Sequence, residues 1–459
     1  MEEAKNEVVV IMVPLPCQSH LNQMLQLSGL IASYAIPVHF VGSATHNRQA
    51  KLRSHGLKPN AMAQIQFHDI PTPPIAAPDP DPYAADKTPM HLAPATTAYV
   101  GMRGAIGLLA QELSQMATRI VVVYDRMGAE AVRDAVSIPN AESYAFNCLS
   151  AFNLFLILWE VMGKPFELDN EAIKELPSVR EFMSEGALYF SASANIEERE
   201  GDIHNTVRFI DDAYMGLMSR DEISGGKKQW AIKSSGLPIF TTMKESSRSH
   251  ECLNWLDKQA PNSVIYVSFG TTTTMTDEEA REIAMGLEQS RQKFVWVVRD
   301  ADRADIFAGE SRRIELPEGF EERVREDGIV VRDWAPQPEI LAHQSVGGFM
   351  SHCGWNSCLE SLTMGVPMAA WPMHSDQPIN AIFMAEILRV GVEVREWGRR
   401  LEMVEAVTVK KAVERLMASE EGDEMRRRAA EVGAAMKISM EEGGESCTEI
   451  ERFIAHITR

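Results

Sequence analysis

Short apolar runs alternate with amphipathic stretches through the first third of the chain. Five runs predict strands, at Val8–Val13, Val38–Val41, Ile65–Phe67, Ile120–Val123 and Ser143–Phe146. Apolar residues recur at helical spacing between Leu21 and Ile31, and further helices are predicted at Met127–Val136 and Phe152–Met162. Continuous β-branched runs are typical of parallel strands that are buried on both faces. The alternation predicts a doubly wound α/β domain.

The same alternation begins again in the second half of the chain. Its predicted strands are Val264–Val267, Phe294–Val298 and Ile329–Val331, and a predicted helix follows the first of them at Asp277–Gln289. Helices are expected over most of residues 403–459. Residues 231–258 are rich in Ser, Lys and Gly without strong periodicity, so we place a linker at 241–258. The chain therefore predicts two α/β domains, residues 1–240 and 259–445.

Two long stretches inside the domains lack a periodic pattern. Residues 70–95 are rich in proline, and residues 300–316 are rich in charged side chains. We expect both to form surface loops, and long loops often line substrate clefts. The apolar helix predicted at Phe152–Met162 is much shorter than the ~20 residues that cross a membrane, so we expect it to be buried.

Length and charge narrow the class of protein. A chain of 459 residues is long for one core, which agrees with two domains. The net charge of −20 argues against nucleic acid or an anionic membrane as a partner. None of the six cysteines forms a Cys-x-x-Cys pair, so neither a zinc site nor a redox centre is indicated. Free thiols, together with an acidic N-terminus that lacks a signal-peptide pattern, favour a cytoplasmic protein.

Residues 334–377 carry the most specific pattern in the chain. An apolar run from Val346 to Met350 predicts a strand, and a helix is predicted to follow a tight turn at His352–Gly354. Asn356 and Ser357 are cap-type residues ahead of that helix. A helix N-terminus directs unpaired N–H groups into the preceding loop, and this arrangement suits a diphosphate.

Side chains of the same block suit the rest of a nucleotide sugar. His352 and Ser357 offer hydrogen-bond donors for phosphate, and Glu360 offers an acceptor for two ribose hydroxyls. Trp334 has a flat face on which uracil can stack. After the predicted strand Val264–Val267, Gly270 and Thr271 can meet the diphosphate from the opposite side. The threonines that follow, residues 272–274, either join them or only lead into the next helix.

A His and an Asp follow two strands of the first domain. His20 comes after Val8–Val13, and Asp125 comes after the strand at Ile120–Val123. Ligands of α/β sheets bind beyond the carboxyl ends of the strands, so these two side chains can meet in the cleft. A neutral imidazole that is oriented by a carboxylate is a suitable general base near neutral pH. The alternative is that His20 caps a helix and Asp125 begins the next one.

The block 334–377 resembles the plant secondary product glycosyltransferase signature, the donor-binding box of plant UDP-sugar glycosyltransferases. The resemblance implies a GT-B arrangement, in which two Rossmann-like domains face a cleft and the last helix, residues 446–459, returns to the first domain. It also implies inverting transfer with His20 as base and Asp125 as its partner. UDP-glucose or UDP-xylose would be a co-substrate, the acceptor a small molecule and the protein a monomer. Neither a cofactor nor a metal ion is implied.

The resemblance assigns donor-binding roles residue by residue. These roles fall on Gly270, Thr271, Trp334, Ala335, Gln337, His352, Gly354, Trp355, Asn356, Ser357, Glu360, Asp376 and Gln377. Trp334 and Gln337 would hold the base, and Glu360 the ribose. His352, Asn356 and Ser357 would hold the phosphates, and Trp355, Asp376 and Gln377 the sugar hydroxyls. In the family Gln377 goes with glucose, although xylose stays open.

Segments outside the block are similar to zeatin O-glucosyltransferases and O-xylosyltransferases. They are residues 20–23, 36–42, 45–53 and 294–302. A zeatin-type cytokinin hydroxyl is therefore the first acceptor hypothesis. Ser19, Tyr124 and Arg126 depart from the pattern of that group, and we expect Arg126 to pair with Asp125 and weaken its hold on His20. A flavonoid or phenolic acceptor, glycosylated at oxygen or carbon, is the alternative, because a phenol needs less help from a base.

Three other classes of protein fit less well. A non-catalytic sugar-nucleotide-binding protein would keep the donor block and lose His20 or Asp125, and both are present. A nucleotide-sugar epimerase would need further carboxylates at the cleft. A Rossmann oxidoreductase would need Gly-x-Gly-x-x-Gly after the first strand, and Pro14–His20 contains no glycine.

Overall fold

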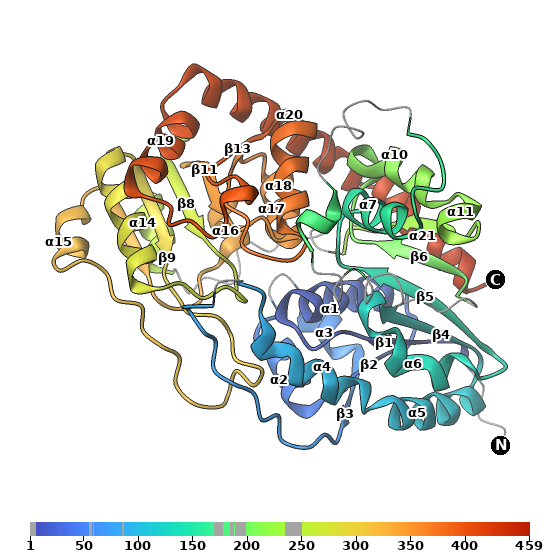
Figure 1. Cartoon of the computed structure of the whole chain (residues 1–459). Coiled ribbons are helices and arrows are strands. Elements are labelled where there is room, and N and C mark those ends of the chain that lie inside the picture. The colour runs from blue at the N-terminus through green and yellow to red at the C-terminus, as the bar shows by residue number, and fades with distance from the viewer. Residues whose placement is uncertain are drawn as a thin grey trace.

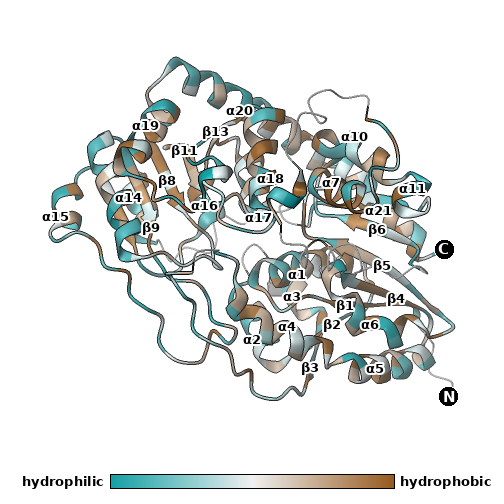
Figure 2. Ribbon diagram, viewed as in Figure 1, coloured by the Kyte–Doolittle hydropathy of each residue, from teal (hydrophilic) through white to brown (hydrophobic). Residues whose placement is uncertain are grey.

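The computed structural model describes residues 6–54, 57, 59–84, 87–168, 178–183, 188, 199–234 and 250–459. Two parallel sheets, each covered by helices on both faces, lie side by side (Figure 1). Strands of both sheets are largely apolar, whereas the helices carry polar residues over much of their outer surface (Figure 2). The predicted fold class, two Rossmann-like α/β domains, is confirmed.

The first sheet has seven strands in the order β3-β2-β1-β4-β5-β6-β7. Their bounds are β1 Asn6–Val13, β2 Val38–Ser43, β3 Ile65–Ile70, β4 Ala117–Asp125, β5 Ala141–Asn147, β6 Gly201–His204 and β7 Lys228–Ala231. The helices of this domain include α1 Gln18–Ala32, α2 Ala44–Leu52, α3 Pro59–Ala63, α4 Ala93–Val100, α5 Arg103–Met116, α6 Ala129–Val136, α7 Ala151–Val161, α10 Arg208–Met218 and α11 Asp221–Ser224. The order reverses direction between β1 and β4, and a ligand crevice is expected at such a point.

The second sheet repeats this plan with six strands in the order β10-β9-β8-β11-β12-β13. Its strands are β8 Val264–Ser268, β9 Lys293–Val297, β10 Gly328–Val331, β11 Val346–Ser351, β12 Met368–Ala370 and β13 Gly391–Glu393. The helices that follow residue 250 are α13 Glu251–Leu256, α14 Asp277–Ser290, α15 Phe320–Val324, α16 Gln337–Leu341, α17 Trp355–Met364, α18 Gln377–Ile382, α19 Ala406–Met417, α20 Glu420–Met440 and α21 Glu445–Ile457. Here the switch point lies between β8 and β11, so it places the donor block beside the Gly270 turn.

All nine strands predicted from apolar runs are present, and their bounds lie within three residues of the expected ones. Four strands were not predicted, namely β6, β7, β12 and β13. The proline-rich stretch 70–95 forms no regular element over residues 71–84 and 87–89, but a 3-10 turn at Met90–Leu92 leads into α4. Within the described ranges, no helix combines the length and apolar character needed to span a membrane.

The expected linker at 241–258 needs correction at its end. Residues 241–249 lie outside the described residues, whereas Glu251–Leu256 form α13. Cys252 and Leu256 of this helix are fully buried in the core that also holds strands of the second sheet. These residues therefore belong to the second domain. The helix has only six residues, too few for a helical period of apolar residues to be visible in the sequence.

The last helix, α21, packs on the first domain (Figure 1). Ile450, Phe453 and Ile457, which share one face of this helix, are buried among residues of β1 and α1. The ring of Phe453 meets Tyr144 edge-on at 5.2 Å and Trp230 at 5.5 Å between ring centroids. The helix α21, which follows the second sheet in the sequence, thus completes the core of the first domain. The two domains are therefore joined through α21 as well as through the chain between β7 and α13.

We expect Phe453→Ala to lower the free energy of unfolding by about 3–5 kcal/mol, because it empties a fully buried aromatic site. Glu451→Ala, an exposed position on the same helix, is the matched control and should change it by less than about 0.5 kcal/mol. Urea denaturation followed by tryptophan fluorescence measures both. Equal midpoints for the two variants would show that α21 is not anchored through this ring.

Candidate active site

A cleft of about 840 Å³, open to solvent, runs between the two domains. The first domain contributes Gln18, Ser19, Asn22 and Arg53 to its lining. The second domain contributes Tyr266, Ser268, Gly270, Thr271, Val297, Arg299, Trp334, Ala335, Gln337, Pro338, His352, Asn356, Ser357 and Glu360. Nine residues of the predicted donor set therefore line one cavity, although they come from three loops and two helices of the second domain.

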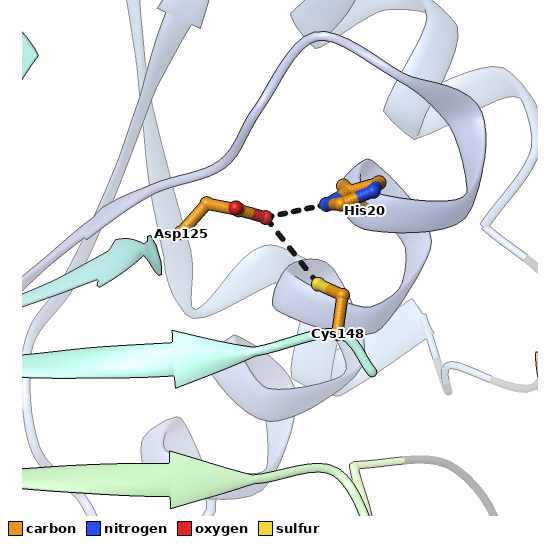
Figure 3. Close-up of side chains that lie close together, drawn as sticks. All are labelled: His20, Asp125 and Cys148. Carbon is orange, nitrogen blue, oxygen red and sulfur yellow. Dashed lines mark hydrogen bonds and ion pairs between the residues drawn. The ribbon is translucent and has the colours of Figure 1, made fainter. Parts of the chain in front are cut away.

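His20 and Asp125 meet at the edge of the first sheet (Figure 3). The Nδ1 atom of His20 lies 2.6 Å from Oδ2 of Asp125. Asp125 is almost fully buried, whereas His20 keeps 16% of its side chain exposed. Burial lowers the pKa of His20, but the charge and hydrogen bond of Asp125 outweigh it, so the pKa is raised above its usual value. The pair therefore combines a fixed imidazole with one ring nitrogen, Nε2, left for another partner.

The alternative in which His20 caps a helix and Asp125 begins the next one is correct only for Asp125. Cys17 is the N-cap of α1, and His20 lies in the first turn without capping it. Asp125 does begin the next segment, because its Oδ1 accepts a hydrogen bond of 3.0 Å from the backbone N–H of Met127. Its other oxygen remains directed at His20, so the capping contact also fixes the carboxylate.

Cys148 is a third member of this cluster that the sequence analysis missed. Its Sγ donates to Oδ2 of Asp125 at 3.3 Å (Figure 3). The ligand atoms of His20, Asp125 and Cys148 lie within 4.8 Å of one another, a spacing that a metal site also has. Burial raises the pKa of the Cys148 thiol well above its usual value, so the sulfur keeps its proton, whereas a metal would bind the thiolate. Cys148 follows β5, so the rule that located Asp125 at a strand end would have located it too.

Arg126 does not pair with Asp125, and that expectation is wrong. Its guanidinium Nη1 lies 3.1 Å from Oδ1 of Asp202 on β6. Arg199 contacts the same carboxylate through two hydrogen bonds, of 2.8 and 3.0 Å. Burial raises the pKa of Asp202, but the two guanidinium groups outweigh it and hold the pKa below its usual range. Arg126 is thus committed to a buried cluster that lies away from His20.

The loop between β11 and α17 is built around His352. Gly354 is the N-cap of α17 and Trp355 is its first residue, so Asn356 and Ser357 lie inside the first turn and do not cap it as expected. A Cβ atom added at Gly270 or at Gly354 would lie 2.5 Å from Nε2 of His352. Burial lowers the pKa of His352 to about 4. The ring is therefore neutral at pH 7 and closely enclosed by the two glycines.

A hydrogen-bond network links the residues predicted to hold the ribose and the base. Nε2 of Gln337 donates to Oε2 of Glu360 at 2.8 Å and to the hydroxyl of Ser357 at 3.0 Å. Burial raises the pKa of Glu360 to about 7, although Gln337 and Lys233 oppose the shift. Glu360 therefore holds a proton part of the time near neutral pH. These contacts fix the position of its carboxyl group, and Glu360 lines the cavity.

Trp334 is covered by two cationic side chains. The guanidinium carbons of Arg53 and Arg299 lie 4.7 and 5.5 Å from its ring centroid. Arg53 belongs to the first domain and pairs with Asp302 of the second, with Nη2 3.1 Å from Oδ1. The Trp334 end of the cleft is therefore closed by an ion pair between the domains.

Three predicted sugar-binding residues have their side chains engaged elsewhere. Nε1 of Trp355 donates to the backbone carbonyl of Asn205 at 2.8 Å. Oε1 of Gln377 accepts the backbone N–H groups of Met373 and His374, at 2.8 and 3.0 Å. The carboxylate of Asp376 accepts from Asn380 at 2.7 Å, and its charge helps to raise the pKa of His20. Of the three, only Asp376 is thus seen to act on the catalytic end of the cleft.

The chain matches known protein families along most of its length. Residues 6–234 match the model described as "Glycosyltransferase, N-terminal domain", and residues 240–421 match "UDP-glucoronosyl and UDP-glucosyl transferase". It is 50% identical to a zeatin O-xylosyltransferase of Phaseolus vulgaris, over 99% of each chain. It is also 50% identical to a zeatin O-glucosyltransferase of Phaseolus lunatus, over 99% of this chain and 98% of the relative.

Solved structures agree with this grouping. A UGT transferase of Siraitia grosvenorii, solved in complex with UDP, superposes with a TM-score of 0.77 at 26% identity, over 99% of this chain and 100% of that one. The two matching family models, together with relatives that are 50% identical over nearly the whole chain, cover both domains of the described fold. The chain therefore belongs to the UDP-dependent glycosyltransferases of plants and is an enzyme with a GT-B fold.

Proposed function

We propose that this enzyme transfers glucose from UDP-glucose, with inversion, to the side-chain hydroxyl of a zeatin-type cytokinin. The observation that carries the proposal is the contact of 2.6 Å between His20 and Asp125 beside the cleft. Identity of 50% with zeatin O-xylosyl- and O-glucosyltransferases supports the acceptor class.

Proton transfer follows from the geometry of this pair. Asp125 accepts from Nδ1 of His20, so Nε2 of the neutral ring is free to take the acceptor proton. The acceptor oxygen then attacks the anomeric carbon of the sugar, and the bond to the diphosphate breaks on the opposite face. UDP leaves with the bonding electrons. The carboxylate of Asp125 stabilises the imidazolium that forms.

The proposed donor site relies on neutral and dipolar groups. The N-terminus of α17, neutral His352, Asn356 and Ser357 would face the diphosphate from one side. Gly270 and Thr271 would face it from the other. The remaining roles are those of the family: Trp334, Ala335 and Gln337 for the base, Glu360 for the ribose, and Gly354, Trp355, Asp376 and Gln377 at the sugar end. None of these roles uses a metal ion.

A second, apolar pocket in the first domain suits the acceptor. Its lining includes Pro14, Leu21, Ile75, Tyr99 and Met102. Pro14 and Leu21 flank the loop and helix start that carry His20, so this pocket borders the base. A flat, mostly apolar ring system fits such a lining better than a sugar does.

The position of Arg126 removes an objection to an alkyl hydroxyl as the acceptor. The phenolic alternative depends on Arg126 pairing with Asp125 and weakening its hold on His20, because a phenol needs less help from a base. Since Arg126 pairs with Asp202 instead, the base keeps its full partner. An acceptor that depends on strong base catalysis is then compatible with the site.

We expect the rate of transfer to fall at acid pH with a midpoint above 6.5. His20 acts as a base only when neutral, and Asp125 raises the pKa of its imidazolium. Asp125→Asn should move that midpoint to lower pH, because it removes the charge. His20→Ala should lower kcat by about 10²–10⁴-fold and leave the Kd for UDP nearly unchanged. Retained turnover in His20→Ala would show that another group is the base.

Gly270→Ala should weaken UDP binding at least tenfold. The added Cβ would lie 2.5 Å from His352, and the backbone there has φ +77°. Gly104→Ala, in a helix where an added Cβ meets nothing within 4 Å, is the matched control and should bind UDP normally. Calorimetric titration with UDP measures both, and normal binding by Gly270→Ala would remove this turn from the donor site.

The substrates themselves can be tested by UDP release and mass spectrometry of the product. We expect turnover of trans-zeatin with UDP-glucose, and slower turnover with UDP-xylose, because Gln377 goes with glucose in this family. A simple flavone aglycone is the comparison acceptor. Turnover of the flavone alone would overturn the cytokinin proposal, and acid stability of its product would then identify a C-linked sugar.

A further inference from the structure

We propose that Cys148 is a positioning residue of the catalytic pair, whose thiol holds the Asp125 carboxylate in place for His20. This inference rests on the proposed role of His20 as the base. Cys148 would touch neither substrate, and it would act only through Asp125.

The carboxylate of Asp125 is held by three donors. Oδ2 accepts from Nδ1 of His20 at 2.6 Å and from Sγ of Cys148 at 3.3 Å, and Oδ1 accepts from the backbone N–H of Met127 at 3.0 Å. Figure 3 shows the thiol and the imidazole approaching the same carboxylate from different sides. Because Asp125 is 1% exposed, water contributes little to its solvation, and each protein donor matters more than it would at the surface.

The thiol is a permanent donor. Burial raises its pKa well above the usual value, and the nearby negative charges of Asp125 and Asp376 act in the same direction. Cys17 and Tyr99, the other titratable groups near Cys148 and Asp125, are themselves shifted upward by burial. Over the working pH range the charge at this site therefore changes at His20, while the thiol stays protonated.

Main-chain contacts fix where the thiol lies. The backbone carbonyl of Cys148 accepts from Nε2 of Gln23 on α1 at 3.3 Å. Oε1 of Gln23 accepts from Asn205 at 2.8 Å, and the carbonyl of Asn205 accepts from Trp355 at 2.8 Å. Cys148 is thereby tied to the helix that carries His20 and, through it, to the helix of the donor loop. The backbone of Cys148 is therefore fixed relative to α1, and its Sγ lies within hydrogen-bond distance of Asp125.

Removing the donor should change the basicity of His20 in a defined direction. A hydrogen bond to Oδ2 draws charge away from the oxygen that faces the imidazole. In Cys148→Ala the full charge acts on His20, so its pKa should rise by about 0.5 pH unit, as expected for the loss of one weak hydrogen bond. Cys148→Ser restores a donor and should return the pKa to the wild-type value or below it.

The test is NMR titration of the His20 imidazole in the full-length wild-type, Cys148→Ala and Cys148→Ser proteins, together with the pH profile of kcat for each. His20→Gln identifies the signal. We expect the acid limb of Cys148→Ala to move upward by the same ~0.5 unit, kcat at its plateau to fall about 3–10-fold from lost orientation, and KM for UDP-glucose to stay constant. Cys252→Ala, a fully buried cysteine of α13 far from the pair in sequence, controls for a cavity in the core.

Two results would overturn the inference. One is an unchanged His20 pKa in Cys148→Ala, and the other is a Cys148→Ser protein that behaves like Cys148→Ala, since sulfur volume and not the donor would then matter. The NMR titration needs no substrate, so it separates the two proposals. A shifted pKa without turnover of any acceptor would leave the role of Cys148 intact and reject the proposed function.

Discussion

The cleft depends on hydrogen bonds that cross between the two domains, because the His20–Asp125 pair lies on one domain and the loops proposed to bind the donor lie on the other. Nδ2 of Asn356 donates to the backbone carbonyl of Ser19 at 3.2 Å, directly before His20. Nε1 of Trp355 donates to the carbonyl of Asn205 at 2.8 Å, and Nδ2 of Asn153 donates to the carbonyl of Asp376 at 3.0 Å. Each bond contributes only about 0.5–1.5 kcal/mol, but together they fix one closed arrangement of the domains. Trp355, Asn356 and Asp376 thus help to hold the two domains together, and Asn356 also lines the cleft.

Burial then sets the protonation state of the groups in this cleft. It makes His352 neutral at pH 7 and brings the pKa of Glu360 to about 7, whereas Asp125 keeps the pKa of His20 high. His352, Glu360 and His20 therefore differ in how readily they bind a proton near pH 7, although the sequence shows only two histidines and a glutamate. A neutral imidazole can donate a hydrogen bond to a phosphate oxygen. A carboxyl group near its pKa can either donate a hydrogen bond to a hydroxyl group or accept one from it.

Sequence patterns predicted what depends on local periodicity and on strand ends. The long β-branched strands and the loop before α17 follow from such patterns. The strand ends allow His20 and Asp125 to meet, but only the family resemblance favours that pairing over the capping alternative. Strands β6, β7, β12 and β13 have only three or four residues each and, unlike the equally short β10, contain no run of β-branched residues that would mark them. The expected contact between Arg126 and Asp125 is wrong because side chains that are neighbours in sequence need not contact each other. Successive side chains along an extended chain point to opposite sides, so Asp125 faces α1 while Arg126 reaches Asp202 on β6.

The overall charge of −20 poses a problem for an enzyme with an anionic donor, and the cleft shows how it is solved. The charged residues that line it are Arg53, Arg299 and Glu360, and both arginines contact Asp302. The cationic charge is therefore largely compensated before any nucleotide arrives. It also lies at the Trp334 end, whereas the helix N-terminus at Gly354 is in the opposite loop. In the donor site that we propose, the diphosphate would be held by oriented N–H groups, whose positions are fixed by the fold.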